Sequence, residues 1–452
     1  MPRRPMARAA PAKRKRRRRP RRKGVASDLP DCISSLPDDV LLAITNRLPT
    51  RLAVSLSVLS RRYRNIPAML PHLDSFLFSE TTSSIPLSPT SPQILRRLDI
   101  APTRRVKPSD FRRLIVSAAD HGVSEIAVRL RRRACVPKHV FSIRSLAVLS
   151  LDTCGVPRLR LSTVACTRLR TFKLHRVFIH QEMITAILSA ATGLETLEMV
   201  FCSGLSGGCT VESSTVRTFL FRPAQEQREV TLTTTGLRTI TLYTRPKVHK
   251  VQLAPSPDVR KAYLHVAKFR DKSVFRIRPF FDAAERLACL TLRGFAMKLL
   301  AGEYEDTAEL PITFQDLRTL SVSLDFSRES EVVFLVKLLG SCPNLQHLTV
   351  SAAENKKKDV CPSFGDPKVM LANVPCLSGS LAQFTFLGYK PEQYQRGLLI
   401  FLLNRANKLK KVSVQFPESA EADVRWALQL RKAPIERKST LFNQQYLELE
   451  YS

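Results

Sequence analysis

Ten cysteines and eight histidines are the residues of this 452-residue chain that could ligate a metal or act as nucleophiles. No two cysteines form a C-x-x-C pair and the histidines are scattered, so the spacing of a zinc site is missing. His175 and His180 lie five residues apart without a third ligand, and we expect them to be surface side chains. Cys202 and Cys209 flank a glycine-rich stretch, which we interpret as a repeat loop and not as a redox centre. We therefore predict no metal and no cofactor.

The sequence also lacks several motifs that carry catalysis or phosphate binding. It contains no G-x-x-x-x-G-K-[ST], no H-E-x-x-H and no G-x-G-x-x-G. No run of about 18 apolar residues predicts a transmembrane helix, and no apolar segment follows the basic N-terminus as in a secretory signal. We expect a non-catalytic protein with no catalytic residues, no membrane contact and free, reduced thiols.

A strong positive charge marks the N-terminus. The net charge is +33, and residues 1–24 hold thirteen Lys and Arg without an acid, so the rest carries +33 − 13 = +20. Such a run predicts a disordered tail. We interpret Lys13, Arg14, Lys15, Arg16, Arg17, Arg18 and Arg19 as a nuclear localisation signal. The alternatives are a plain basic tail that contacts nucleic acid non-specifically and an organelle transit peptide. The expected compartment is the nucleus, with the cytoplasm as a second location.

Residues 31–78 predict a small helical module. Pro37 suits a first helical turn because its missing N–H would be unpaired there, and Asp38 and Asp39 favour the positive end of the helix dipole. Val40, Leu41, Ile44 and Leu48 follow at helical spacing, Pro49 ends the helix, and Leu59 lies on the apolar side of the next one. The unit is too small for a large core, so its apolar faces should complete their burial against a partner.

From residue 123 onward, an apolar-x-x-apolar-x-apolar unit recurs twelve times. The units begin at Val123, Leu146, Leu169, Leu194, Val216, Leu237, Val259, Leu287, Leu317, Leu345, Leu381 and Leu409. This spacing is typical of leucine-rich repeats, in which each unit supplies one short strand and a return segment, and stacked neighbours form a parallel sheet on a concave side.

Particular positions within these repeats have expected roles. Cys154 and Cys202 occupy the site that takes inward-facing Asn or Cys, so both thiols should be buried and structural. The segments 181–191 and 331–339 predict helices, and residues 351–370 an exposed insertion. Specificity should come from the intervening positions of the units, such as Lys173, Glu198, Arg238 and Gln346.

The stretch from Asp31 to Phe78 resembles the plant F-box domain. The matching residues are Asp31–Leu41, Ile44, Leu48–Arg51, Ala53, Ser57–Arg62 and Tyr63–Arg64, with Tyr63 at a position where the family usually has Trp. The repeats resemble those of plant F-box/leucine-rich-repeat proteins, and Phe384–Tyr389 with Phe401–Leu409 resembles their C-terminal FBD-type region.

This resemblance implies the substrate receptor of an SCF-type ubiquitin ligase. A Skp-family adaptor, and through it a cullin, would bind the F-box, and the repeats would hold an unknown target protein. Adaptor contacts are then expected from Leu36, Pro37, Val40, Leu41, Ile44, Leu48, Pro49 and Leu59, although Ile44 or Leu48 could instead pack inside the module.

The resemblance also gives the domain order and leaves other functions open. The expected α/β chain has a basic tail (1–27), a three-helix F-box (28–78), a linker with a helical entry segment (79–120), leucine-rich repeats (121–374) and terminal repeats with an FBD-like cap (375–452). The main alternative function is a nuclear nucleic-acid or chromatin-binding repeat protein that uses the basic tail and body. Another is a scaffold that binds the adaptor without promoting turnover.

Overall fold

The computed structural model describes most of the chain downstream of residue 95 and a few residues before it. The described residues are Leu36, Pro37, Val40 and residues 75–78, 96–102, 107–130, 134–158, 163–205, 207–225, 227–269, 274–353, 374–390, 392–415, 437–443 and 446–451. None of the described helices is long and apolar enough to cross a membrane.

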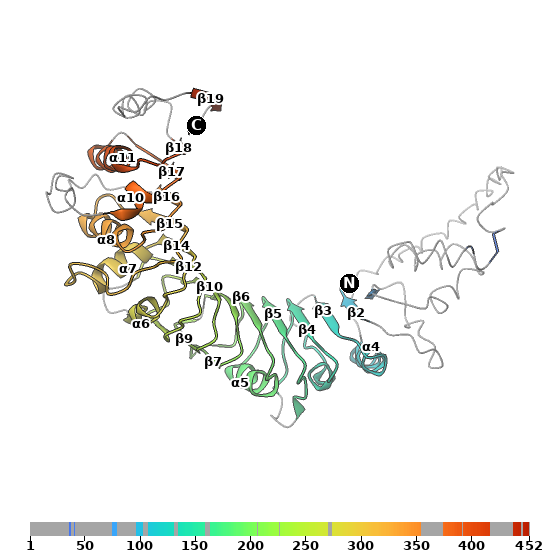
Figure 1. Cartoon of the computed structure of the whole chain (residues 1–452). Helices are drawn as coiled ribbons and strands as arrows, with labels where there is room; N and C mark the ends of the chain where they lie inside the picture. Colours follow the sequence, from blue (N-terminus) through green and yellow to red (C-terminus); the bar gives the residue numbers. More distant parts are fainter. Residues whose placement is uncertain are drawn as a thin grey trace, which may run out of the picture.

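One long curved sheet joins these residues into a solenoid (Figure 1). Neighbouring strands pair in parallel up to β18, and the last two pairings are antiparallel. In spatial order, its sixteen described strands are β1 (Ser75–Phe78), β2 (Arg97–Ile100), β3 (Glu125–Arg129), β4 (Val148–Asp152), β5 (Thr171–His175), β6 (Thr196–Val200), β8 (Thr218–Arg222), β10 (Thr239–Tyr243), β12 (Lys261–Val266), β14 (Cys289–Gly294), β15 (Thr319–Leu324), β16 (His347–Ala352), β17 (Gln383–Leu387), β18 (Lys411–Gln415), β20 (Tyr446–Tyr451) and β19 (Arg437–Asn443).

The alternation of side chains along each strand explains the curved sheet. In β5, for example, Phe172 and Leu174 are buried, while Thr171, Lys173 and His175 face outward. Burying one such apolar side chain stabilises the fold by about 1.5–3 kcal/mol. Because adjacent strands repeat this alternation in register, the buried positions merge into one continuous core. All twelve sequence units therefore form the strands expected of them.

The return segments lie on the outer side of the curve (Figure 1). Many of the return segments are helical. The described helices are α4 (Pro108–Asp120), the short 3₁₀ helix η2 (Lys138–Ser142), α5 (Gln181–Ala190), α6 (Arg278–Asp282), α7 (Ala296–Glu303), α8 (Glu329–Gly340), α10 (Pro375–Gly379) and α11 (Gln393–Arg405). The helices expected at residues 181–191 and 331–339 are confirmed as α5 and α8.

A second parallel sheet replaces helices in the middle repeats, which the sequence analysis did not predict. Its strands are β7 (Cys209–Ser213), β9 (Glu229–Thr234), β11 (Lys250–Leu253) and β13 (Val274–Arg276). The units beginning at Leu194, Val216 and Leu237, which hold β7, β9 and β11, are only 21–22 residues long, whereas β13 lies in a longer unit that also contains α6. Such short units leave little room for a helix, and segments such as β9 alternate buried and exposed residues as strands do.

The sheet also begins earlier than the repeat pattern indicated. β2 pairs with β3, and β1 with β2. The same apolar spacing is present there, with Leu95, Leu98 and Ile100 before β3 and Leu73, Phe76 and Phe78 one unit earlier. The helical entry segment forms α4, and most of the insertion expected at residues 351–370 lies outside the described residues.

A left-handed residue turns the chain out of the sheet at the same place in five repeats. Two positions after the third apolar residue of the unit stand Thr153, Arg176 and Phe201, with φ of 56°, 53° and 55°, and Gly294 and Gly388, with φ of 63° and 68°. Glycine adopts this conformation without strain, whereas other residues are held in it by their surroundings. Local geometry is therefore shared between repeats whose sequences differ.

Candidate functional site

Three of the eight expected adaptor contacts fall within the described residues. Leu36 is half-buried, Pro37 is exposed, and Val40 has 42% of its surface exposed. Pro37 and Val40 thus expose apolar surface. The remaining five contacts, Leu41, Ile44, Leu48, Pro49 and Leu59, and the basic run at residues 13–19 lie outside the described residues.

The concave face is ion-paired in its first half. Outward-facing basic side chains of β2 to β5 lie beside carboxylates on the same or a neighbouring strand. The pairs are Arg97 Nε to Asp99 Oδ1 (3.0 Å), Arg129 Nε to Asp152 Oδ2 (3.0 Å), His175 Nδ1 to Asp152 Oδ1 (2.9 Å) and Lys173 Nζ to Glu198 Oε1 (2.9 Å). Two expected specificity residues, Lys173 and Glu198, therefore neutralise each other. The other two, Arg238 and Gln346, are exposed just before β10 and β16, at the amino-terminal edge of the sheet.

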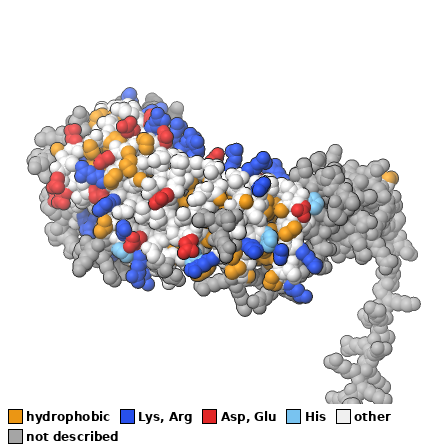
Figure 2. Space-filling model, turned by 90° about the horizontal axis from the view of Figure 1, so that it is seen from below, with side chains coloured by type: hydrophobic (Ala, Val, Ile, Leu, Met, Phe, Trp, Pro, Cys, Tyr) orange, Lys and Arg blue, Asp and Glu red, His pale blue; other side chains and the backbone are white. Residues whose placement is uncertain are grey.

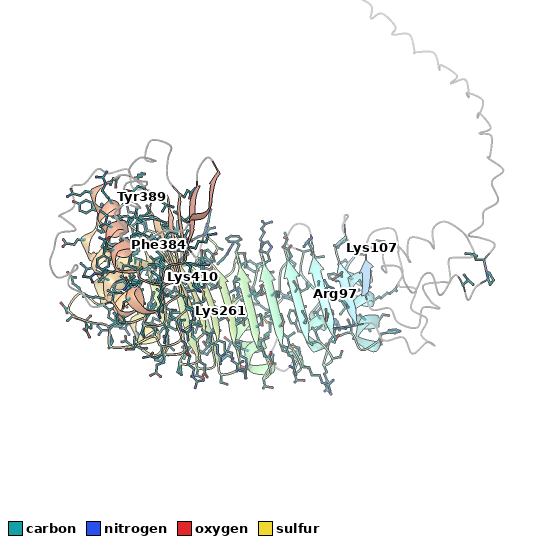
Figure 3. The ribbon with its side chains drawn as sticks, turned by 45° about the horizontal axis from the view of Figure 1, so that its top comes forward. Arg97, Lys107, Lys261, Phe384, Tyr389 and Lys410 are labelled. Carbon is teal, nitrogen blue, oxygen red and sulfur yellow. The ribbon has the colours of Figure 1, made fainter. Side chains whose placement is uncertain are left out.

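The second half of the concave face has cations without carboxylates. Among the described strands of the long sheet from β8 to β18, no outward-facing position carries Asp or Glu. Arg222 on β8, Lys261 on β12 and Arg293 on β14 make no ion pair within the described residues. Figure 3 shows Lys261 on the strand row midway along the solenoid. By contrast, the side seen from below in Figure 2 shows basic, acidic and hydrophobic side chains intermingled.

Four outward-facing side chains in this half of the sheet, two arginines, a tyrosine and a histidine, form a row across adjacent strands. By strand register, Tyr243 pairs with His265, and His265 pairs with Arg293. Arg222 is the next position on β8, and its Nη2 donates a hydrogen bond of 2.8 Å to Tyr243 Oη. Its guanidinium carbon also lies 4.1 Å from the Tyr243 ring centroid. We call Arg222, Tyr243, Tyr263, His265 and Arg293 the concave cluster.

The rings of the concave cluster pack closely. Tyr243 lies 5.1 Å from Tyr263 and 5.5 Å from His265, between ring centroids. Burial, then Arg293 and Arg222, lower the pKa of His265, so this imidazole is mostly neutral at pH 7. Burial and the neighbouring Tyr243 raise the pKa of Tyr263, which keeps its hydroxyl protonated.

Hydroxyl groups hold Arg293 in place. Its Nη1 donates to Ser351 Oγ at 2.8 Å and its Nη2 to Ser321 Oγ at 3.4 Å. At the other end of the row, Nε of Arg222 is buried without a hydrogen-bond partner. Both guanidiniums are therefore positioned by neutral groups and keep their full positive charge facing the concave side.

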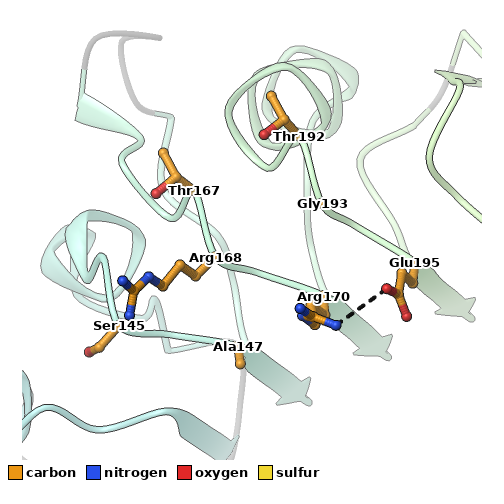
Figure 4. Close-up of a pocket in the computed structure, with 8 residues that line it drawn as sticks. All are labelled: Ser145, Ala147, Thr167, Arg168, Arg170, Thr192, Gly193 and Glu195. Atoms are coloured by element: carbon orange, nitrogen blue, oxygen red, sulfur yellow. Dashed lines mark hydrogen bonds and ion pairs between the residues drawn. The ribbon is translucent and has the colours of Figure 1, made fainter.

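A shallow pocket of about 600 Å³ opens elsewhere, at the amino-terminal edge of β4 to β6 (Figure 4). It is lined by Ser145, Ala147, Thr167, Arg168, Arg170, Thr192, Gly193 and Glu195. Arg170 and Glu195 stand at equivalent positions of successive repeats, and their side chains pair at 3.5 Å. The pocket is thus a groove between repeats in which Arg170 and Glu195 compensate each other and Arg168 adds one positive charge.

Three buried thiols of the repeats are structural. Cys154 and Cys202 are each 1% exposed, as expected for the inward site, and Cys209 is equally buried. Burial raises the pKa of all three thiols to about 12, so they remain protonated at neutral pH. His175 faces the concave side beside Asp152, and His180 packs edge-on against Phe178 at 5.0 Å.

One catalytic-type string does occur at 204–208, where Gly-Leu-Ser-Gly-Gly fits the G-x-S-x-G spacing. A nucleophile elbow of that type requires a strand that turns directly into a helix. Here the segment follows β6 and leads into β7, so two strands flank it, and Ser206 itself lies outside the described residues. The local topology therefore does not fit the elbow.

The region that resembles the FBD type lies in the last parallel repeats of the solenoid. Phe384 and Phe386 of β17 are buried, and Phe386 meets Tyr389 edge-on at 5.4 Å. Gly388 supplies the left-handed turn, and Tyr389 N donates to Gln415 O at 2.9 Å. Helix α11 then covers this strand pair from the outer side (Figure 1). The aromatic residues of this motif therefore serve the core.

Sequence reasoning missed the concave cluster. Its row members Arg222, Tyr243, His265 and Arg293 each follow the third apolar residue of a unit, whereas specificity was expected from positions between the apolar residues. Aligning the units in columns shows this position as Asp152, His175 and Val200 in the first half and as Arg, Tyr, His and Arg in the next four strands. That column was the available signal.

Comparison with known proteins agrees with the fold and the N-terminal motif. Residues 33–73 match the F-box domain family, and residues 111–262 match a family described as "FBD-associated F-box protein At5g56370, LRR repeats". The chain is therefore a leucine-rich-repeat protein with an F-box near its N-terminus. The expected α/β solenoid is confirmed, while the three-helix form of the F-box lies outside the described residues.

The full-length relatives are plant F-box proteins. The chain is 26% identical to FBD-associated F-box protein At4g10400 of Arabidopsis thaliana over 85% of its own length and 92% of the relative. It is 25% identical to FBD-associated F-box protein At5g38590 of the same plant over 85% and 93%. Over a shorter stretch, 41% of each chain, it is 32% identical to putative F-box/LRR-repeat protein At5g02930. The resemblance to plant F-box/leucine-rich-repeat proteins is thus confirmed.

Proposed function

We propose that this chain is the target-recognition subunit of an SCF-type ubiquitin ligase. The observation that carries the proposal is the F-box match at residues 33–73 joined to a repeat solenoid with an open concave face. The F-box binds a Skp-family adaptor, which links the chain to a cullin. The concave face holds the protein to be ubiquitinated.

The proposed mechanism is proximity without catalysis by this chain. Two binding surfaces on one body raise the local concentration of the target near the conjugating enzyme. The buried thiols of Cys154 and Cys202 stay protonated because burial raises their pKa to about 12, which makes them poor acceptors for ubiquitin. The reactive cysteine then belongs to the separate conjugating enzyme.

Capture of the adaptor tests the docking half of the proposal. The full chain is co-expressed with a Skp-family adaptor and a cullin, as wild type and as a Leu36→Ala/Pro37→Ala variant. Loss of apolar contacts at an interface centre should weaken adaptor binding about tenfold or more. If the folded double variant captures the adaptor as well as the wild type, these residues are not the docking contacts.

A pair of valine-to-aspartate substitutions tests whether a new surface charge disrupts adaptor binding only when it lies in the F-box. Val40 is 42% exposed within the F-box match, and Val116 is 40% exposed on α4 of the solenoid. Val40→Asp should abolish adaptor capture, whereas Val116→Asp should leave it unchanged. Circular dichroism reports whether each variant folds. Equal loss from both variants would contradict a docking surface in the F-box.

Turnover is a separate measurement. A reconstituted complex with conjugating enzyme and ubiquitin should transfer ubiquitin to a protein captured on the repeats. Adaptor capture with no transfer to any captured protein would instead favour the scaffold function that the sequence left open.

A further inference from the structure

We propose that the concave cluster is the specificity site of the repeats and that it binds an extended acidic segment of the target protein. The proposal rests on the function proposed above and names the chemistry of its target. The cluster contains the residue types that dominate interface energetics, Arg and Tyr, half-buried side by side on the concave face.

Charge complementarity indicates an acidic occupant. The three cations of β8, β12 and β14 have no carboxylate partner among the described residues, and the strands that carry them present no outward-facing acid. Two described acids outside this row are already paired with cations of their own. Glu229, on β9 of the second sheet, pairs with Lys250 at 2.9 Å, and Asp325, after β15, pairs with Arg328 at 2.9 Å.

The same solenoid offers an internal comparison. On β2 to β6, each outward carboxylate is already matched by a cation within the sheet. That half has little unsatisfied charge to offer a partner. The second half has the same architecture without the acids, so its positive potential faces the partner.

The spacing of the arginines indicates more than one acidic side chain. Arg222 and Arg293 stand on β8 and β14, three strands apart in the sheet order, which is about 14 Å at the usual strand spacing. Arg293 leans away from Arg222, because it donates to Ser351 on β16. One carboxylate cannot bridge both guanidiniums. Two acidic side chains on an extended segment can reach them.

An aromatic floor lies between the two arginines. Tyr243, Tyr263 and His265 form a packed group with ring centroids 5.1 and 5.5 Å apart. Such a floor accommodates an apolar side chain of the bound segment between its acidic ones. The expected target sequence is therefore acidic with an apolar residue inside it.

Nucleic acid fits this surface less well. Binding through phosphates draws on many cations, with about six to ten phosphate contacts in typical cases. The outward positions of β8 to β14 supply three full positive charges, because burial and the two arginines keep His265 mostly neutral. The hydrogen bonds from Arg293 to Ser351 and Ser321 also hold its guanidinium in one position.

Selection from a random peptide library tests the proposal. A display library of 16-residue random peptides is passed over the immobilised full chain in 150 mM NaCl, and the most enriched peptide is labelled for fluorescence anisotropy. We expect enrichment of Asp and Glu flanking an apolar residue. We expect Arg222→Gln/Arg293→Gln to raise the Kd of that peptide at least tenfold.

A matched control removes the same charge from the paired half of the same face. Arg129→Gln/Lys173→Gln should change the Kd less than twofold, because those cations are already neutralised by Asp152 and Glu198. The basic N-terminal tail is present in every variant, so it cancels in the comparison. If the double variant does not fold, Arg222→Gln serves alone, because it leaves the Arg293 hydrogen bonds to Ser351 and Ser321 in place. It should raise the Kd about threefold.

Three outcomes would overturn the proposal. They are a selection without acidic enrichment, an equal loss in the control variant, and tighter, arginine-dependent binding of a 20-nucleotide single-stranded DNA in place of the peptide. Adaptor capture is measured on the same preparations. Peptide binding without adaptor capture would refute the ligase function alone, and adaptor capture without acidic selectivity would refute the specificity site alone.

Discussion

Replacing Gly294 by alanine isolates the role of close backbone packing between repeats. Gly294 ends β14 with φ of 63°, directly after Arg293 of the concave cluster. A Cβ built there would lie 2.3 Å from the carbonyl oxygen of Val266 in the preceding repeat. That oxygen accepts a hydrogen bond of 2.7 Å from Phe295 N. The added methyl group must therefore push two repeats apart or break this bond.

Gly388 provides the matched control. It occupies the same place in a later repeat with φ of 68°, but a Cβ there would meet its nearest atom, Ala352 O, at 3.8 Å. Gly388→Ala should thus cost only the left-handed strain, about 1 kcal/mol. Gly294→Ala adds overpacking of about 2 kcal/mol, for about 3 kcal/mol in total. The two variants differ by the backbone clash alone.

Urea unfolding followed by circular dichroism measures the difference. Because repeats contact mainly their neighbours, hydrogen exchange should locate the loss at the Phe295 amide and the strands beside it. The protection of this amide should fall in Gly294→Ala and remain in Gly388→Ala. Equal destabilisation by the two substitutions would refute the argument from close packing.

Further predictions concern pH, thiol reactivity and location. Burial raises the pKa of Glu331 to about 7, outweighing the attraction of Arg328. This folded pKa exceeds the unfolded value of 4.5, so the stability contribution is complete below pH 4.5 and is lost as pH rises through 7. Glu331→Gln should therefore gain up to about 3 kcal/mol over wild type at pH 8 and nothing at pH 4.5, measured by urea unfolding; a pH-independent difference would contradict this. Cys135 is exposed whereas Cys154 is buried with a pKa of about 12, so maleimide labelling of the native protein, read by mass spectrometry, should modify Cys135 and spare Cys154 until unfolding. We also predict that replacing the seven basic residues 13–19 by Gln moves a fluorescent fusion out of the nucleus; unchanged nuclear accumulation would leave the tail without an import role.

Local periodicity was enough to predict the repeats. Each unit places two apolar residues on the buried side of its strand, and this depends only on the twofold alternation of a strand. The inward sites of Cys154 and Cys202 followed from the same spacing. The helices at 181–191 and 331–339 were equally visible, because their apolar residues recur at helical intervals.

The return segments of the shortest units could not be assigned to helix or strand from periodicity. Units of 21–22 residues allow either a short helix or a strand. The neighbouring return segments decided between them, because β7, β9, β11 and β13 stabilise one another by hydrogen bonds that no single unit can make. Of the eight adaptor contacts expected from the sequence, the described residues include three, Leu36, Pro37 and Val40.

The sequence alone determined that this protein is a chain of stacked repeats with an F-box motif before them, because both signals lie within short stretches of neighbouring residues. Only the tertiary structure decided which charges on the concave face remain available. Arg222 and Arg293 are 71 residues apart in the sequence, and Lys173 and Glu198 are 25 apart. Strand register brings the second pair into contact, and it places no carboxylate of a described strand beside the two arginines of the first pair. Charge compensation depends on distances across the sheet, and those distances exist only after the repeats have stacked.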